Sequence, residues 1–251
     1  MENNSNITTN IIEAINTILN TLFSSIDNNV YSVLDDITFI NSDIITDSYF
    51  EKILGTSTSN GILLISNSLL FGFLLYYAIK YLFAHFTYQQ VERPSQFIFK
   101  LIIWGLCINF SYFFIEQILN FVSNISLAIR GIGENLFHKN ICFSELILEI
   151  NNNISIDSSS LDVFSLDGII KASLTMSLLN LVFTYSFRYV MIKIFILLTP
   201  FAILSLTLEN TSWFFKAWSR NLFSLLFIQI IVSIVLLILF SMDYYSNNLM
   251  T

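Results

Sequence analysis

The sequence predicts an all-α, polytopic membrane protein with about four to five transmembrane helices and an N-terminal amphipathic helix. Hydrophobic residues make up 55% of the chain and charged residues 12%, and the mean hydropathy is +0.69. A helix rises about 1.5 Å per residue, so the uncharged run Leu222–Met242 is long enough to cross a hydrocarbon core of about 30 Å. Three further apolar runs exceed what the helices of a soluble domain need, and they cover Ile62–Ile79, Leu101–Ile115 and Ile169–Phe187.

Residues 1–60 are polar and acidic, and we expect them to form an exterior region built around an amphipathic helix. Apolar residues recur every three or four positions from Ile7 to Leu34, with Asn, Ser and Thr on the opposite side. A helix that binds anionic lipid carries Lys and Arg on its polar face, and this chain has no basic residue before Lys52. We therefore expect the helix to dock on a partner protein. Packing on its own membrane domain is the alternative, and residues 41–60 form a connector.

Residues 61–116 contain the first two predicted transmembrane helices, at residues 61–83 and 97–115. In the next region, residues 117–168, a helical apolar stripe continues to Leu136. We expect this helix to leave the membrane, continue as an amphipathic helix and lead into an acidic exterior loop at residues 139–167.

The C-terminal transmembrane region, residues 169–251, begins with an apolar segment that is too long for one span. Residues 169–208 would form a helix of about 60 Å, twice the thickness of a bilayer core. Two arrangements fit: two spans divided by a basic turn at Arg188–Lys193, or one span followed by a short re-entrant segment at Ile194–Leu208, where Pro200 interrupts the helix.

Basic residues near the span ends predict the orientation. Lys80, Arg93 and Lys100 cluster in the first short loop, which is therefore expected on the cytoplasmic side. The N-terminal region and the loop at residues 139–167 would then lie outside. A re-entrant segment would keep Lys216 inside as well. The predicted location is a multi-pass position in the inner, cytoplasmic membrane.

Catalytic and cofactor motifs are absent from the sequence. His85 and His138 stand far from any Cys or carboxylate at metal-ligand spacing, and no Gly-rich phosphate loop occurs. We expect no catalytic residue, metal or cofactor, and no enzyme activity. The net charge of −7 with only 11 scattered Lys and Arg argues against direct sequence-specific binding of nucleic acid.

Polar and charged residues within the spans are candidate intramembrane sites, because such residues are costly in hydrocarbon. Arg188 and Lys193 lie near predicted span ends, where long side chains can snorkel to the interface. Glu116 has a shorter side chain that snorkels poorly. Interhelical hydrogen bonds and the lining of a polar conduit are both open for the candidate set Glu116, Asn109, Asn180 and Gln229.

The region Leu198–Leu226 carries a block of recognisable residues before the terminal span. A Pro-Phe pair opens an apolar stretch, and a Thr, a Phe and a Trp follow at Pro200, Phe201, Thr211, Phe215 and Trp218. In this block the chain resembles the TrbL-like polytopic channel subunits of type IV secretion and conjugation machines. The resemblance also covers the order of parts: an exterior N-terminal region, two spans, an exterior loop and then the block. Trp213 and Trp218 are expected at headgroup depth.

The resemblance implies a non-enzymatic integral membrane subunit that forms or scaffolds the substrate path of a transfer channel. Its partners would be other membrane secretion subunits, further copies of itself and the lipid bilayer. A small-molecule or ion transporter is the alternative, although inverted repeats and paired broken spans are not visible. A membrane-embedded enzyme would need a cluster of His or Asp residues, and a holin-like lesion former would not need the long flanks.

Overall fold

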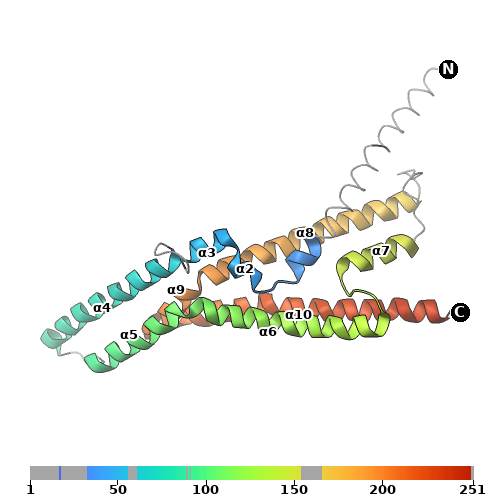
Figure 1. Cartoon of the computed structure of the whole chain (residues 1–251). Coiled ribbons are helices and arrows are strands. Elements are labelled where there is room, and N and C mark those ends of the chain that lie inside the picture. Colours follow the sequence, from blue (N-terminus) through green and yellow to red (C-terminus); the bar gives the residue numbers. More distant parts are fainter. Residues whose placement is uncertain are drawn as a thin grey trace, which may run out of the picture. The chain divides into compact units, whose positions relative to one another are not determined.

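The computed structural model describes residues 17, 33–55, 61–88, 90, 92–153 and 166–249, and every regular element within them is a helix (Figure 1). Residues 33–38 are also helical. The elements in chain order are α2 (Asp43–Thr46), α3 (Ser48–Leu54), α4 (Ile62–Thr87), α5 (Pro94–Asn109), α6 (Ser111–Phe137), α7 (Phe143–Asn153), α8 (Leu166–Leu197), α9 (Thr199–Leu204), the 3₁₀ turns η1 (Ser205–Thr207) and η2 (Glu209–Thr211), and α10 (Ser212–Leu249).

Four of the described helices are long and apolar enough to cross a membrane, which confirms the predicted helical membrane class. In their apolar windows the mean hydropathy ranges from 1.3 to 3.0, and it is highest in α10. Few of these residues are buried within the chain, so their surfaces are available to lipid or to other proteins. The four segments are Ile62–Thr87, Ser111–Phe137, Ser173–Leu197 and Ser212–Met242.

The second predicted span differs from the helix that forms. The expected helix at residues 97–115 is divided at Phe110, where α5 ends and α6 begins one residue later. With 16 residues, α5 is about 24 Å long, shorter than a bilayer core of about 30 Å. The helix that is long enough is α6, which includes the stripe expected to continue outside the membrane.

Contacts divide the chain into two compact units, and each is described here by itself. One unit comprises residues 40–125 and 190–230. In it, α4 and α5 form an antiparallel hairpin, and α9 packs against both helices (Figure 1). Its core is built from Ile108 on α5 together with Ile203 and Leu204 on α9.

The other unit comprises residues 1–39, 126–189 and 231–251. Leu34, Ile147 of α7 and Leu178 of α8 form its buried core. The hydroxyls of Ser126 and Ser233 lie 2.6 Å apart and hydrogen-bond α6 to α10. Thus a polar contact between small side chains supplements apolar packing at this helix pair.

The structure describes only part of the region for which N-terminal elements were predicted. The amphipathic helix predicted from Ile7 to Leu34 lies outside the described residues except at residue 17 and its last two positions. The predicted connector at residues 41–60 contains two short helices, α2 and α3. The predicted acidic loop contains the helix α7, which forms because its first amides bond to Asp35 and its apolar side packs on Leu34. Residues 154–165 of that loop lie outside the described part.

Of the two arrangements left open for residues 169–208, the one with a basic turn at Arg188–Lys193 does not form, because α8 continues unbroken to Leu197. Arg188 does not snorkel either. Its side chain is only 5% exposed, and its Nη1 donates a 2.9 Å hydrogen bond to the carbonyl oxygen of Thr38. Its guanidinium also lies 5.9 Å from the ring centre of Tyr185. A backbone acceptor and an aromatic face thus compensate this buried cation.

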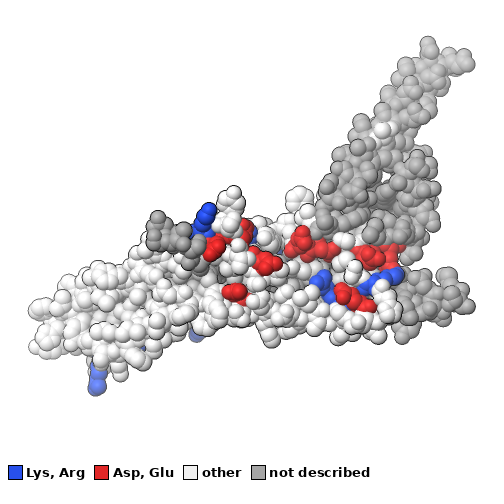
Figure 2. Space-filling model, viewed as in Figure 1, with Lys and Arg blue, Asp and Glu red and all other residues white. Residues whose placement is uncertain are grey.

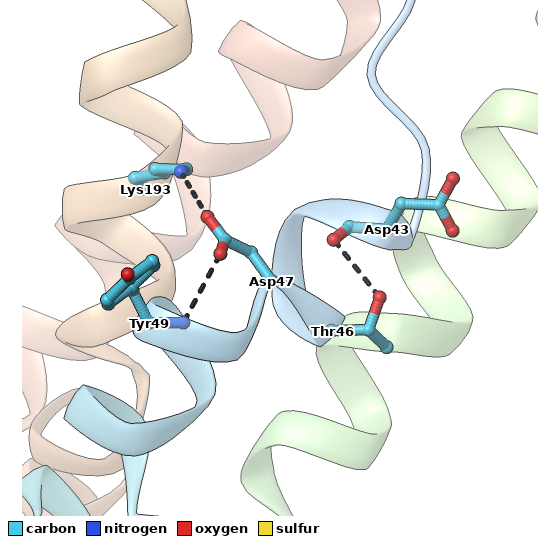
Figure 3. Close-up of polar contacts among 5 residues, drawn as sticks. All are labelled: Asp43, Thr46, Asp47, Tyr49 and Lys193. Atoms are coloured by element: carbon cyan, nitrogen blue, oxygen red, sulfur yellow. Dashed lines mark hydrogen bonds and ion pairs between the residues drawn. The ribbon is translucent and has the colours of Figure 1, made fainter.

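Lys193 is held by a second set of contacts, in the unit that contains α3 (Figure 3). Its Nζ lies 3.5 Å from the carboxylate of Asp47 and 5.2 Å from the ring centre of Phe50. Asp47 also caps α3, because its Oδ1 accepts a hydrogen bond of 3.3 Å from the amide of Tyr49. One carboxylate therefore fixes the start of α3 and binds a cation on α8.

Candidate functional site

The block singled out in the sequence folds as a tight series of turns between α8 and α10. Pro200 is the second residue of α9, where its missing N–H costs nothing. The hydroxyl of Ser205 donates to the carbonyl of Ala202 at 2.6 Å. The hydroxyl of Thr211 lies 2.7 Å from the carbonyl of Ser205 and 3.1 Å from that of Leu208, and can donate to either. These side chains satisfy carbonyls that no continuous helix would satisfy.

Trp218 fastens this block to the end of α8. It is 7% exposed, and its Nε1 donates a 2.8 Å hydrogen bond to the carbonyl oxygen of Phe195. That carbonyl is one of the last four of α8, which lack a donor from their own helix. Trp218 is therefore a buried cap of α8, and its expected place at headgroup depth stays a prediction. Trp213, at 66% exposed, is the one free to face the interface.

Four of the five block residues contribute to one packed region. Phe215 packs on the core of Ile108, Ile203 and Leu204, and its ring centre lies 5.6 Å from that of Trp218. Pro200 is buried and Phe201 half-buried in α9. The block is therefore a rigid joint, and its residues act by packing and hydrogen bonding.

A polar cavity of about 370 Å³ lies where this joint meets the hairpin of α4 and α5. The hairpin contributes two lysines, a glutamate and two tyrosines, and the joint contributes Thr207, Leu208 and Asn210. The hairpin side chains come from the last turns of α4, from the segment between the helices and from the first turns of α5. Charged and polar groups in the lining include Lys80, Lys100, Glu92, Tyr76, Gln90 and Asn210.

The loop beside the cavity is fixed in place by Tyr77 and Lys100. Lys100 Nζ lies 2.5 Å from Oε1 of Glu92. The hydroxyl of Tyr77 donates a hydrogen bond to the backbone carbonyl of Glu92. The Tyr77 ring also stacks on Phe97, with ring centres 3.8 Å apart and planes 8° from parallel. Glu92 is thus held by Lys100 through its side chain and by Tyr77 through its backbone.

An apolar groove of about 420 Å³ adjoins the same stacked pair. Tyr77 and Phe97 line both the cavity and the groove. The remaining groove residues are almost all apolar, and they are Leu74, Ala78, Tyr81, Leu82, Pro94 and Ile98. On the face that Figure 2 shows, few charged residues lie on α4 and α5, and both helices expose many large apolar side chains.

The predicted intramembrane polar residues do not form one site. Asn109 pairs with Asn67 across α4 and α5, with amide contacts of 3.1 and 3.4 Å. Gln229 is buried on α10, and its Oε1 accepts a 3.1 Å hydrogen bond from the amide of Ile40. Glu116 is half-buried on α6, and Asn180 is exposed on α8. For Asn109 and Gln229, these contacts fit the interpretation as residues that hydrogen-bond a helix to another helix or to another segment of the chain.

From the sequence, the two lysines of the cavity served only to predict orientation, and Glu92 was not singled out. Lys80 and Lys100 are twenty residues apart, and Glu92 lies between them in the loop. The signal that could have revealed the cavity is the hairpin itself, which brings the end of α4 beside the start of α5. Tyrosines three and four residues before Lys80 add a second sign of an interfacial site.

Comparison with protein-family models, curated proteins and solved structures finds no match to this chain.

Proposed function

We propose that this chain is a non-enzymatic integral membrane subunit of a transfer channel of the type IV secretion or conjugation kind, which forms or scaffolds the substrate path through the inner membrane. The proposal starts from the resemblance in the block from Pro200 to Trp218. In this proposal, the block is a joint that sets the direction in which α10 follows α8.

The observation that carries the proposal is how little of the membrane helices the chain buries by itself. In the apolar window of α4 only 11% of residues are buried, and even in α10 the share is 33%. Asn180 is exposed in the middle of the apolar part of α8. An amide facing lipid would lack hydrogen-bond partners, so this position favours contact with another membrane subunit.

Segments outside the spans support the same proposal. Asp35 binds the first turn of α7, and Arg188 binds the carbonyl of Thr38. Residues 33–39 are therefore held against the helices of their own unit, directly after the N-terminal region that we propose as a docking element for partner subunits. A solitary transporter has no need of such an attachment.

The test uses a photoreactive amino acid at Asn180 in the full chain, in membranes of the native host. We expect cross-links to a second copy or to another integral membrane subunit of a secretion machine. The matched control places the same probe at Phe183, which is also exposed on α8 but apolar, at 73% exposure. Cross-links to lipid alone at Asn180 would contradict the proposal.

Reconstitution separates the proposal from the transporter alternative. The purified chain in liposomes should neither hydrolyse nucleotide nor take up a small solute selectively. Selective uptake by the chain alone would favour a small-molecule or ion transporter.

A further inference from the structure

We infer that the cavity and the groove at the hairpin of α4 and α5 together bind one anionic phospholipid, with the headgroup phosphate in the cavity and an acyl chain in the groove. This inference rests on the two adjoining surfaces and is independent of whether the chain serves a secretion channel.

The first argument is charge. Among the described lining side chains, two lysines and one glutamate leave a net charge of +1 in the cavity. Because Glu92 and Lys100 form an ion pair, the net positive charge of the lining comes from Lys80, and the ammonium group of Lys100 can share its hydrogen bonds between Glu92 and an incoming phosphodiester. A lipid with one negative charge complements this set. The ammonium group of a zwitterionic headgroup would instead add a cation beside two lysines.

The second argument is hydrogen bonding. Tyr76, Gln90, Thr207 and Asn210 line the same cavity, and each carries a side-chain donor or acceptor. A headgroup that carries hydroxyls, such as glycerol, can form hydrogen bonds with these groups. A bare phosphate is too small to contact all of them at once. The cavity of about 370 Å³ is large enough for a glycerophosphate headgroup.

The third argument is the adjoining apolar surface. Tyr77 and Phe97 form one wall of the cavity and one wall of the groove, so the polar and apolar surfaces meet at their stacked rings. A soluble phosphate has no use for the groove. A lipid presents both chemistries at once, joined at its glycerol backbone, which would lie at the Tyr77–Phe97 pair.

The fourth argument is depth. Lys80 precedes the end of α4 by seven residues, and Lys100 follows the start of α5 by six, so both lie about 10 Å from the hairpin end. A hairpin end at the outer edge of the headgroup layer would place both lysines near the boundary between headgroups and acyl chains. Tyr76, Tyr77 and Tyr81 lie in the same turns of α4, as expected for an interfacial belt.

Native mass spectrometry of the purified full chain in detergent tests the inference. The probes are palmitoyl-oleoyl phosphatidylglycerol, palmitoyl-oleoyl phosphatidylcholine and free glycerol phosphate. We expect one retained phosphatidylglycerol, bound about tenfold more tightly than phosphatidylcholine. Free glycerol phosphate should not displace it. Displacement would identify a site for soluble phosphate and overturn the inference, as would equal binding of the two lipids.

Matched variants locate the site. The double change Lys80→Gln and Lys100→Gln should weaken phosphatidylglycerol binding about tenfold and leave phosphatidylcholine binding unchanged. The control double change, Lys52→Gln and Lys216→Gln, alters the net charge equally outside the cavity and should have no effect. An equal loss in the control would show a general charge effect and contradict the site.

A second pair of variants tests the groove. Ala78→Phe fills the groove and should weaken phosphatidylglycerol binding, whereas Ala128→Phe places the same ring on an exposed position of α6 and should not. Circular dichroism checks the fold of every variant. If the change at Lys100 impairs folding, Lys80→Gln alone decides the result, because Lys80 is exposed. Unchanged binding in that single variant would overturn the inference.

Discussion

The indole Nε1 of Trp218 donates a hydrogen bond to the carbonyl oxygen of Phe195, across a distance of 2.8 Å. The hydroxyl of Thr199 donates to the same oxygen at 3.2 Å. Two side chains thus complete the last turn of α8, on either side of the joint that leads to α10.

Trp218→Phe should lower the stability of the purified chain by about 1–2 kcal/mol, because the ring is retained but the bond to Phe195 is lost. Trp218→Ala should cost about 3–5 kcal/mol through the additional cavity. Thermal unfolding in detergent measures both. Trp213→Phe is the control and should leave the transition unchanged, since Trp213 is exposed. An equal loss of stability for Trp218→Phe and Trp213→Phe would contradict the role of Trp218 as a cap of α8.

Asp35 should control the stability of α7. Its carboxylate accepts hydrogen bonds from the amides of Phe143 at 2.8 Å and Ser144 at 3.2 Å, and from the Ser144 hydroxyl. Asp35→Ala should therefore destabilise α7 by about 1–2 kcal/mol. The readout is faster hydrogen exchange in residues 143–153. The neighbouring change Asp36→Ala removes the same charge from an exposed side chain and should leave that exchange unaltered.

Two glycines of α6 should respond in opposite ways to substitution. A Cβ at Gly133 would lie 2.7 Å from atoms of both Ile141 and Leu237, whereas one at Gly131 would meet nothing within 4 Å. Gly133→Val should destabilise the chain by about 1–3 kcal/mol through overpacking. Gly131→Ala should stabilise it by up to about 1 kcal/mol through helix propensity. Unfolding temperatures of the two variants should move in opposite directions from that of the parent.

Cys142 should react slowly with thiol reagents at neutral pH. Burial raises the pKa of its thiol, and the nearby carboxylate of Asp35 raises that pKa further. The amide of Glu145, 3.4 Å from its Sγ, acts in the opposite direction. Since only the thiolate reacts, the alkylation rate should rise at a higher pH than for an exposed cysteine. The measurement uses maleimide on a C107S variant, with Asn140→Cys in C107S/C142S as the exposed reference. Matching pH profiles would refute this.

Long apolar runs predicted α4, α8 and α10, because a helix that can span a bilayer is recognised from the length and the composition of its sequence alone. The boundary at Phe110 was not predictable, since neither Pro nor Gly marks it. The continuous course of α8 was missed for a different reason. Arg188 and Lys193 indicated a turn, and their partners Thr38 and Asp47 come from residues about 150 positions earlier.

The cavity illustrates the same limit at the level of the site. Lys80, Glu92 and Lys100 can be read from the sequence as loop charges, but their convergence depends on the packing of α4, α5 and the joint. The block singled out Trp218, but the hydrogen bond of its indole depends on a carbonyl acceptor, which no sequence pattern displays. Residue types were therefore predictable here, and their partners were not.

The bend at Phe110 has a consequence for electrical insulation. Its N–H bonds to the carbonyl of Leu106 at 3.1 Å, and its own carbonyl accepts the amide of Phe114 at 3.1 Å. A proline kink removes a donor and leaves a carbonyl that attracts water within a bilayer. The chain changes direction here while both backbone groups of Phe110 stay paired. The backbone of Phe110 therefore presents no unpaired donor or acceptor to water or ions within a membrane.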